Sequence, residues 1–84
     1  MTTLPLHGFL QGDTLGLLVM VDEEESMGEV ARRLQEAASV RVRLWPPVAI
    51  IHGGRELDPS WSVRRAGLRP LDRVDVVERS EALP

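Results

Sequence analysis

The 84 residues are enough for one domain, and hydrophobic residues at 43% with charged residues at 27% exclude intrinsic disorder. The absence of cysteine excludes disulfides, cysteine-based zinc sites and thiol catalysis, and a net charge of -3 disfavours a nucleic-acid partner. No apolar run approaches the roughly 20 residues of a membrane helix, and no signal-peptide pattern is present, so we expect a cytoplasmic protein. We expect a single domain over residues 1–84, with 79–84 as a frayed tail.

The first part of the chain predicts two strands joined by a tight turn. Residues 4–11 alternate, which indicates a strand with its leucines on one face and His7 and Phe9 on the other. The Gly-Asp-Thr sequence at 12–14 supplies turn chemistry, and residues 15–21 form a second strand. Both faces of this second strand are apolar: one carries Leu15, Leu17, Val19 and Val21, and the other carries Gly16, Leu18 and Met20.

An amphipathic helix follows, from residue 27 to residue 38. Ser26 is a good N-cap residue, and the Glu29 carboxylate can reach back to the cap amide to complete a capping box. The acidic run at 22–25 precedes this end, where the helix dipole favours negative charge. The apolar face of the helix carries Met27, Val30, Ala31, Leu34 and Ala38. The opposite face offers two i,i+4 pairs of opposite charge, Glu29–Arg33 and Arg32–Glu36.

The second part of the chain predicts shorter elements. Residues 40–47 contain Pro46-Pro47, which favours a connection with a few extended residues. Two brief strands follow, at 48–52 and 55–57, and the glycine pair between them allows a tight turn.

A short helical turn and a last strand complete the pattern. Ser60 or Ser62 can cap a turn that runs through Arg65, and Gly67 ends it in the left-handed conformation. Residues 73–78 form the last strand. This order of elements predicts an α+β fold of the ubiquitin-like β-grasp type. It is a mixed sheet of four to five strands with one main helix, in which the first and last strands lie side by side.

The sequence offers no catalytic or metal-binding constellation. His7 and His52 lie on different strands without a metal-ligand spacing, so surface or edge histidines are expected. The acidic run at 22–25 can in principle bind a cation, but at a helix start we expect it to be solvated. The sequence ends in Glu-Ala-Leu-Pro, so we do not expect the Gly-Gly chemistry of ubiquitin-like modifiers. We predict no catalytic, cofactor-binding or metal-binding residue.

A binding surface remains. The sheet face away from the helix is apolar in the predicted arrangement, where a free face is normally polar, and Ile51 and Val77 join it if the register agrees. We expect this face to dock on a larger subunit, with two arginines and a tryptophan at its rim. The predicted interface residues are Phe9, Leu18, Met20, Arg41, Arg43, Trp45 and Trp61. For each tryptophan, the alternative is that its ring caps one end of the small core.

Four collinear stretches carry a resemblance to a known family. They are L-P-L-H-G-F-L at 4–10, V-D-E-E-E-S-M-G-E-V-A at 21–31, R-E-L-D-P-S at 55–60 and A-G-L-R-P-L-D-R-V-D-V-V at 66–77. Together with the chain length, they resemble the small gamma subunit of the toluene monooxygenase hydroxylases, within the bacterial multicomponent diiron monooxygenases. The resemblance implies a ubiquitin-like fold, in agreement with the order of elements.

The resemblance also implies a hydroxylase built from paired copies of three polypeptides, in which the large subunit holds the diiron centre. The resemblance implies that a Rieske-type ferredoxin and a reductase would deliver the electrons. The chain is then a non-catalytic structural subunit of an aromatic or alkene monooxygenase, without a cofactor of its own. Its partners are the large subunit and a second hydroxylase subunit, with no nucleic acid and no membrane. The alternative is a stand-alone bacterial ubiquitin-like adaptor, such as one associated with a secretion system.

Overall fold

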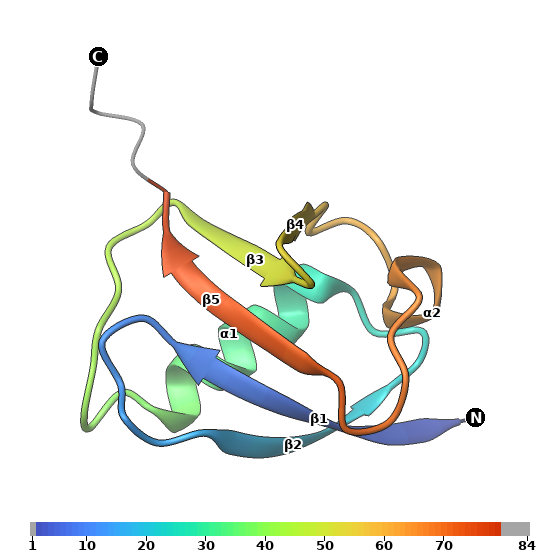
Figure 1. Cartoon of the computed structure of the whole chain (residues 1–84), viewed down its shortest axis with the longest axis horizontal. Coiled ribbons are helices and arrows are strands. Elements are labelled where there is room, and N and C mark those ends of the chain that lie inside the picture. Colours follow the sequence, from blue (N-terminus) through green and yellow to red (C-terminus); the bar gives the residue numbers. More distant parts are fainter. Residues whose placement is uncertain (1, 80–84) are drawn as a thin grey trace.

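A computed structural model of the chain describes residues 2–79. In that part of the chain the elements are β1 (Thr3–Leu10), β2 (Leu17–Asp22), α1 (Met27–Ala37), β3 (Val48–His52), β4 (Arg55–Leu57), α2 (Val63–Ala66) and β5 (Arg73–Glu78). Figure 1 shows the strands in one sheet, with α1 lying across one of its faces. The predicted order of elements is confirmed.

The sheet has the strand order β2-β1-β5-β3-β4. β1 and β5 are parallel neighbours at its centre, with His7 opposite Arg73, and all other pairs are antiparallel. A parallel pair needs a long crossover, and the chain between these two strands supplies it with α1. The predicted pairing of the first and last strands, and with it the β-grasp arrangement, is confirmed.

The N-terminus of α1 is capped as the sequence predicts, but only by half of the capping box. Ser26 has an extended backbone, and its hydroxyl accepts a hydrogen bond from the Glu29 N–H at 3.1 Å. The Glu29 carboxylate instead accepts from the Arg32 Nε at 2.9 Å, so it does not return to the cap amide. An arginine one turn away competes successfully for this exposed carboxylate.

The predicted Glu29–Arg33 pair is wrong, whereas the Arg32–Glu36 pair is confirmed with 3.1 Å between Nη1 and Oε2. Arg33 turns toward the loop before the helix and pairs with Glu25, with 2.8 Å between Nη1 and Oε2. The partner of Arg33 is therefore set by the path of the chain that enters the helix. Helical spacing alone does not determine it.

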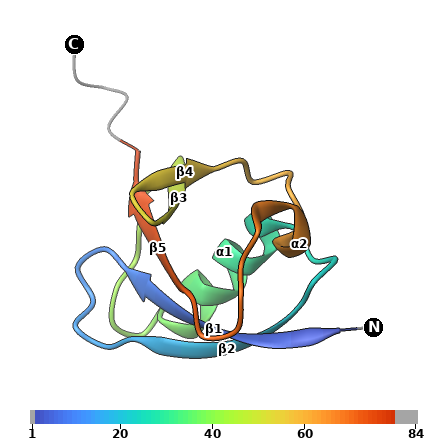
Figure 2. The ribbon, with the colours of Figure 1, turned by 45° about the vertical axis from the view of Figure 1, so that its right-hand side comes forward.

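The core lies between the sheet and α1, which contacts β1, β2 and β3 (Figure 2). Its largest fully buried side chains are Leu6, Val21, Met27, Val30, Leu34, Leu57, Val63, Val74 and Val76. Leu34 is 1% exposed and fills the space above Gly8. A Cβ at residue 8 would lie 2.7 Å from Leu34 Cδ1, so glycine at this strand position is what lets the helix approach the sheet.

The short helix α2 is capped by Ser62, whose hydroxyl accepts from the Arg65 N–H at 3.0 Å. Ser60 does not cap it, because its hydroxyl donates to the Asp58 Oδ1 at 2.7 Å in the preceding turn. Gly67 has φ 77° and ends α2 in the left-handed region, as the sequence predicts.

Several boundaries differ from the sequence prediction by one or two residues. β2 begins at Leu17 rather than residue 15, because the Leu15 N–H donates to the Asp13 Oδ1 and widens the turn before the strand. Arg79, placed in the frayed tail, donates its N–H to the Pro47 carbonyl at 2.9 Å, which continues the pairing between β5 and β3 by one residue. The rest of that predicted tail, 80–84, lies outside the described residues. None of the described helices is long and apolar enough to cross a membrane.

Candidate interaction surface

The sheet face away from α1 exposes two large apolar side chains of β2. Leu18 lies opposite His7 and Met20 lies opposite Pro5, so both side chains point to the same face. Leu18 is 63% exposed and Met20 is 53% exposed. Exposed leucine and methionine side chains two positions apart form a small apolar surface on this edge of the sheet.

The centre of the same face is less apolar than the sequence suggests. Phe9 is half-buried, because the Arg73 guanidinium lies 4.0 Å from its ring centroid. Arg73 also pairs with Asp75, with 3.0 Å between Nη2 and Oδ1. Ile51 lies opposite Asp75 and, like Val77, is half-buried on this face, so the expected register is confirmed. The charged pair on β5 therefore lies between Phe9 of β1 and Ile51 of β3 on this face.

The outer edge of β2 is covered by an ion pair. Arg33 donates from Nη2 to the Met20 carbonyl at 2.9 Å, and the Asp22 N–H donates to the Glu25 Oε1 at 3.3 Å. Since Arg33 and Glu25 also bind each other, they occupy the backbone groups of this part of the edge. Such blocking of an edge strand opposes pairing with another strand, and it leaves the side-chain surface of β2 as the exposed feature.

Arg41 ties the connection after α1 to the turn between β1 and β2. Its Nε lies 3.1 Å from both carboxylate oxygens of Asp13, whose side chain is 2% exposed. The hydrogen bond from Arg41 lowers the pKa of Asp13 from its ordinary value, against the opposing effect of burial. Leu15 donates its N–H to the same carboxylate, so Asp13 binds both Arg41 and the backbone that leads into β2.

This pair predicts a pH-dependent contribution to stability. A folded-state pKa below the unfolded value stabilises the protein above about pH 4, and the contribution is lost as the pH falls through the folded pKa. Asp13→Asn should therefore lower the unfolding free energy at pH 6, and the gap to the wild type should close near pH 2. Urea titrations at both pH values measure this. Arg41→Met should behave in the same way, and a gap that stays constant with pH would contradict the assignment.

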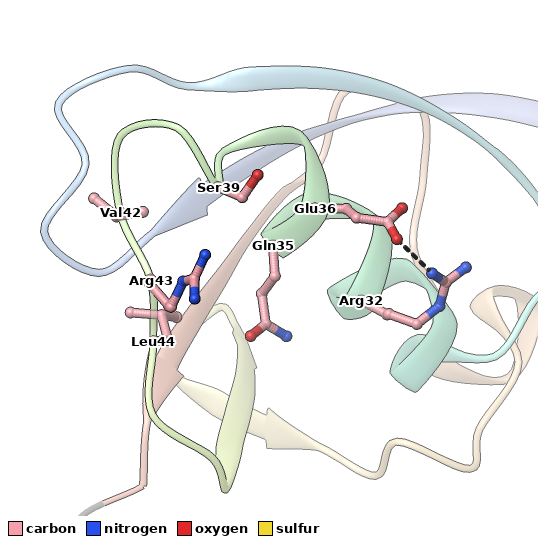
Figure 3. Close-up of a pocket in the computed structure, with 7 residues that line it drawn as sticks. All are labelled: Arg32, Gln35, Glu36, Ser39, Val42, Arg43 and Leu44. Atoms are coloured by element: carbon pink, nitrogen blue, oxygen red, sulfur yellow. Dashed lines mark hydrogen bonds and ion pairs between the residues drawn. The ribbon is translucent and has the colours of Figure 1, made fainter.

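Arg43 and Trp45 lie farther along the same connection. Trp45 is 78% exposed, and its backbone N–H donates to the Glu78 Oε2 at 2.8 Å. Arg43 is exposed and lines a groove against α1, on the helix side of the sheet (Figure 3). These two residues therefore do not share the face of Leu18 and Met20.

Trp61 lies apart from both the β2 surface and the connection after α1. It is half-buried and packs against the core, with Arg65 5.7 Å from its ring centroid. Its carbonyl accepts the Met27 N–H at 2.8 Å, so it sits beside the start of α1. The ring borders a second hollow of about 400 Å³ that Arg79 also lines. This position has the geometry of a residue that closes one end of the core.

The structure thus distributes the seven predicted interface residues over several places. Phe9, Leu18 and Met20 share the free face, Arg41 holds the turn, Arg43 and Trp45 lie along the connection, and Trp61 packs against the core. The sequence prediction missed Leu15 and Val40, which are 52% and 89% exposed. Alternation placed Leu15 on the core face of a longer strand, whereas in the structure it precedes β2 and is exposed.

Of the histidines and the acidic run, the candidate groups of the sequence, most make structural contacts. His52 Nδ1 lies 2.9 Å from the Arg73 carbonyl, and His7 is exposed on β1. In the acidic run, which we expected to be solvated, Glu24 pairs with Arg64 and stays exposed, whereas Glu25 pairs with Arg33 and is largely buried. Within residues 2–79, no three His, Cys, Asp or Glu side chains gather in a way that could hold a metal ion, so they do not fit a diiron centre.

The arrangement of sheet and helix defines a ubiquitin-like protein. The structure is similar to Caldiarchaeum subterraneum ubiquitin, with 16% identity, a TM-score of 0.77 and coverage of 94% of this chain and 96% of that chain. A design based on ubiquitin gives 22% identity, a TM-score of 0.76 and coverage of 94% and 92%. At these identities the likeness shows the fold alone.

Sequence comparison identifies the family within this fold. A family model described as toluene-4-monooxygenase system protein B (TmoB) matches residues 3–77, and the chain belongs to this family. The structure is also similar to a chain of the toluene 4 monooxygenase HD complex with the inhibitor 4-bromobenzoate. The two share 25% identity and a TM-score of 0.80, over 93% of this chain and 100% of that chain. No curated protein sequence matches. The family resemblance predicted from the sequence is confirmed.

Proposed function

We propose that the chain is the non-catalytic gamma subunit of a multicomponent diiron monooxygenase hydroxylase that acts on aromatic hydrocarbons or alkenes. The observation that carries the proposal is the family match over residues 3–77. The likeness to a whole chain of a toluene 4 monooxygenase complex supports it. In this proposal the chain is cytoplasmic and docks on the large diiron subunit, in an assembly that also contains a second hydroxylase subunit.

The role of the subunit is to stabilise the assembled hydroxylase. Oxygen activation and oxidation of the substrate belong to the large subunit, and electrons come from separate proteins. The chain binds the folded large subunit and so shifts that subunit toward its folded state by mass action. A small rigid fold with engaged polar groups suits this role, because little conformational entropy is lost on binding.

The exposed apolar surface of β2 is the proposed main contact. Leu18 and Met20 lose water on docking, and each Å² of apolar surface buried contributes about 25 cal/mol. Phe9 lies beside them under the Arg73 guanidinium, and an arginine stacked on an aromatic ring can pair with a partner carboxylate while it keeps that stacking.

Co-expression with the large and second hydroxylase subunits of the same organism tests the proposal. We expect the tagged chain to purify with both polypeptides in equal amounts, and iron to follow the large subunit. Omission of the chain should lower the unfolding temperature of the remaining hydroxylase. Recovery of the tagged chain alone would contradict the proposal, and co-purification with a membrane translocase would favour the adaptor alternative.

A further inference from the structure

A groove of about 310 Å³ lies between the C-terminal half of α1 and the connection at residues 42–44. Figure 3 shows its two walls: Arg32 and Glu36 project from the helix, and Arg43 reaches from the connection toward the helix. The groove opens on the helix side of the sheet, and it is bordered by the segment that Arg41 fastens to Asp13.

The charged groups around the groove are paired within the chain, except one. Arg32 is held by Glu36 and by Glu29. Arg43 has no carboxylate within salt-bridge distance among the described residues. An exposed arginine whose neighbours are neutralised is available to a carboxylate of another molecule, and its planar fork suits bidentate binding.

The remaining lining is mixed, with polar Gln35 and Ser39 beside apolar Val42 and Leu44. Val42 and Leu44 are half-buried and pack against the core, so they form a fixed floor. The same connection carries two strongly exposed apolar side chains, Val40 at 89% and Trp45 at 78%. Arginine and tryptophan are the residues that most often dominate binding energy at protein interfaces. The groove and the exposed connection beside it therefore fit a segment that carries one carboxylate with polar and apolar side chains around it.

We propose that this groove binds a carboxylate-bearing segment of the large hydroxylase subunit, with Arg43 as the counter-ion. The inference rests on the proposed function and adds the contact that orients the chain. Charge complementarity selects an acidic segment, since the one unpaired group in the groove is a cation. The pair of Arg41 and Asp13 fixes the start of the connection that carries Arg43.

The Arg43 side chain can also stabilise the isolated chain, and the test must separate this effect from docking. It lies near the C-terminal end of α1, whose last turn carries no basic residue, and a cation there favours the helix dipole. Loss of that effect would lower the stability of the isolated chain without a change in docking. The experiment therefore measures unfolding of each isolated variant as well as its incorporation into the hydroxylase.

The test is a competition for incorporation into the assembled hydroxylase. Wild-type chain and a variant chain with a different tag are co-expressed in equal amounts with the other subunits, and the ratio in the purified complex is measured. Arg43→Glu should be incorporated at least about tenfold less than the wild type. Arg55→Glu is the matched control, because it makes the same charge reversal at an exposed position of β4, and it should compete equally.

The outcomes separate the two proposals. Failure of the wild type to enter any complex would overturn the proposed function and the groove assignment together. Entry of the wild type with equal incorporation of Arg43→Glu would overturn only the groove assignment. A photo-reactive residue in place of Arg43 should cross-link to the large subunit beside an Asp or Glu. Cross-links confined to the second subunit, or a loss that follows lower stability of the isolated variant, would also overturn it.

Discussion

Leu34→Ala lowers the free energy of unfolding by about 2–5 kcal/mol, the usual range for truncation of a fully buried leucine. Leu34 is 1% exposed and lies between α1 and the central strand β1. Its removal leaves a cavity that the sheet cannot close, because the strands on both sides of β1 are hydrogen-bonded to it. In a chain of 84 residues this is a large part of the whole stability.

Urea unfolding of the isolated chain, followed by tryptophan fluorescence or circular dichroism, measures the effect. Leu18→Ala is the matched control, since the same atoms are removed from a side chain that is 63% exposed. We expect that control to change the unfolding free energy by less than about 0.5 kcal/mol. Equal losses at the two leucines would contradict the assignment of the helix face that packs on the sheet.

The contact with Gly8 makes the prediction more specific. A Cβ at residue 8 would lie 2.7 Å from Leu34 Cδ1, so Gly8→Ala alone overpacks the core and should cost about 1–3 kcal/mol. In the double variant, the new methyl group fills part of the cavity left by Leu34→Ala. The two losses should therefore be less than additive, whereas additive losses would mean that the residues do not share one space.

The elements of the fold could be predicted from the sequence because each has a local signal. The serine before α1, the alternation in β1 and the glycine after α2 act over a few residues, and the structure confirms all three. The central pairing of β1 with β5 followed from the order of elements. A β1–β2 hairpin, a helix that crosses the sheet and a second set of strands bury the apolar face of α1 when the first and last strands are neighbours.

The surface could not be predicted to the same extent, because it depends on contacts between distant parts of the chain. Arg33 has carboxylates within reach on the helix and in the preceding loop, and only the path of that loop selects Glu25. The sequence pattern places Phe9 and Leu18 on the same free face and does not show which of them is exposed. Arg73, which is 64 positions from Phe9, covers that ring, while Leu18 stays exposed.

The second prediction with a large expected effect concerns the exposed apolar side chains of β2 and their role in incorporation. Leu18→Glu combined with Met20→Glu should reduce incorporation into the hydroxylase by about 100-fold or more, because docking would bury two unpaired carboxylates against an apolar surface. The isolated double variant should remain folded, since both side chains already face water. The competition between differently tagged chains measures incorporation, and urea unfolding measures stability.

Leu71→Glu is the control that locates the docking surface. Leu71 is 58% exposed, comparable to Leu18 and Met20, but it lies in the loop before β5, where its N–H donates to the Pro5 carbonyl. If incorporation required exposed apolar side chains anywhere on the chain, glutamate at any of the three positions would reduce it. If docking occurs on β2, only the substitutions at Leu18 and Met20 reduce it. If Leu71→Glu alone abolishes incorporation, the contact is centred on the loop before β5 and not on β2. The β2 surface would then be exposed in the assembly as well.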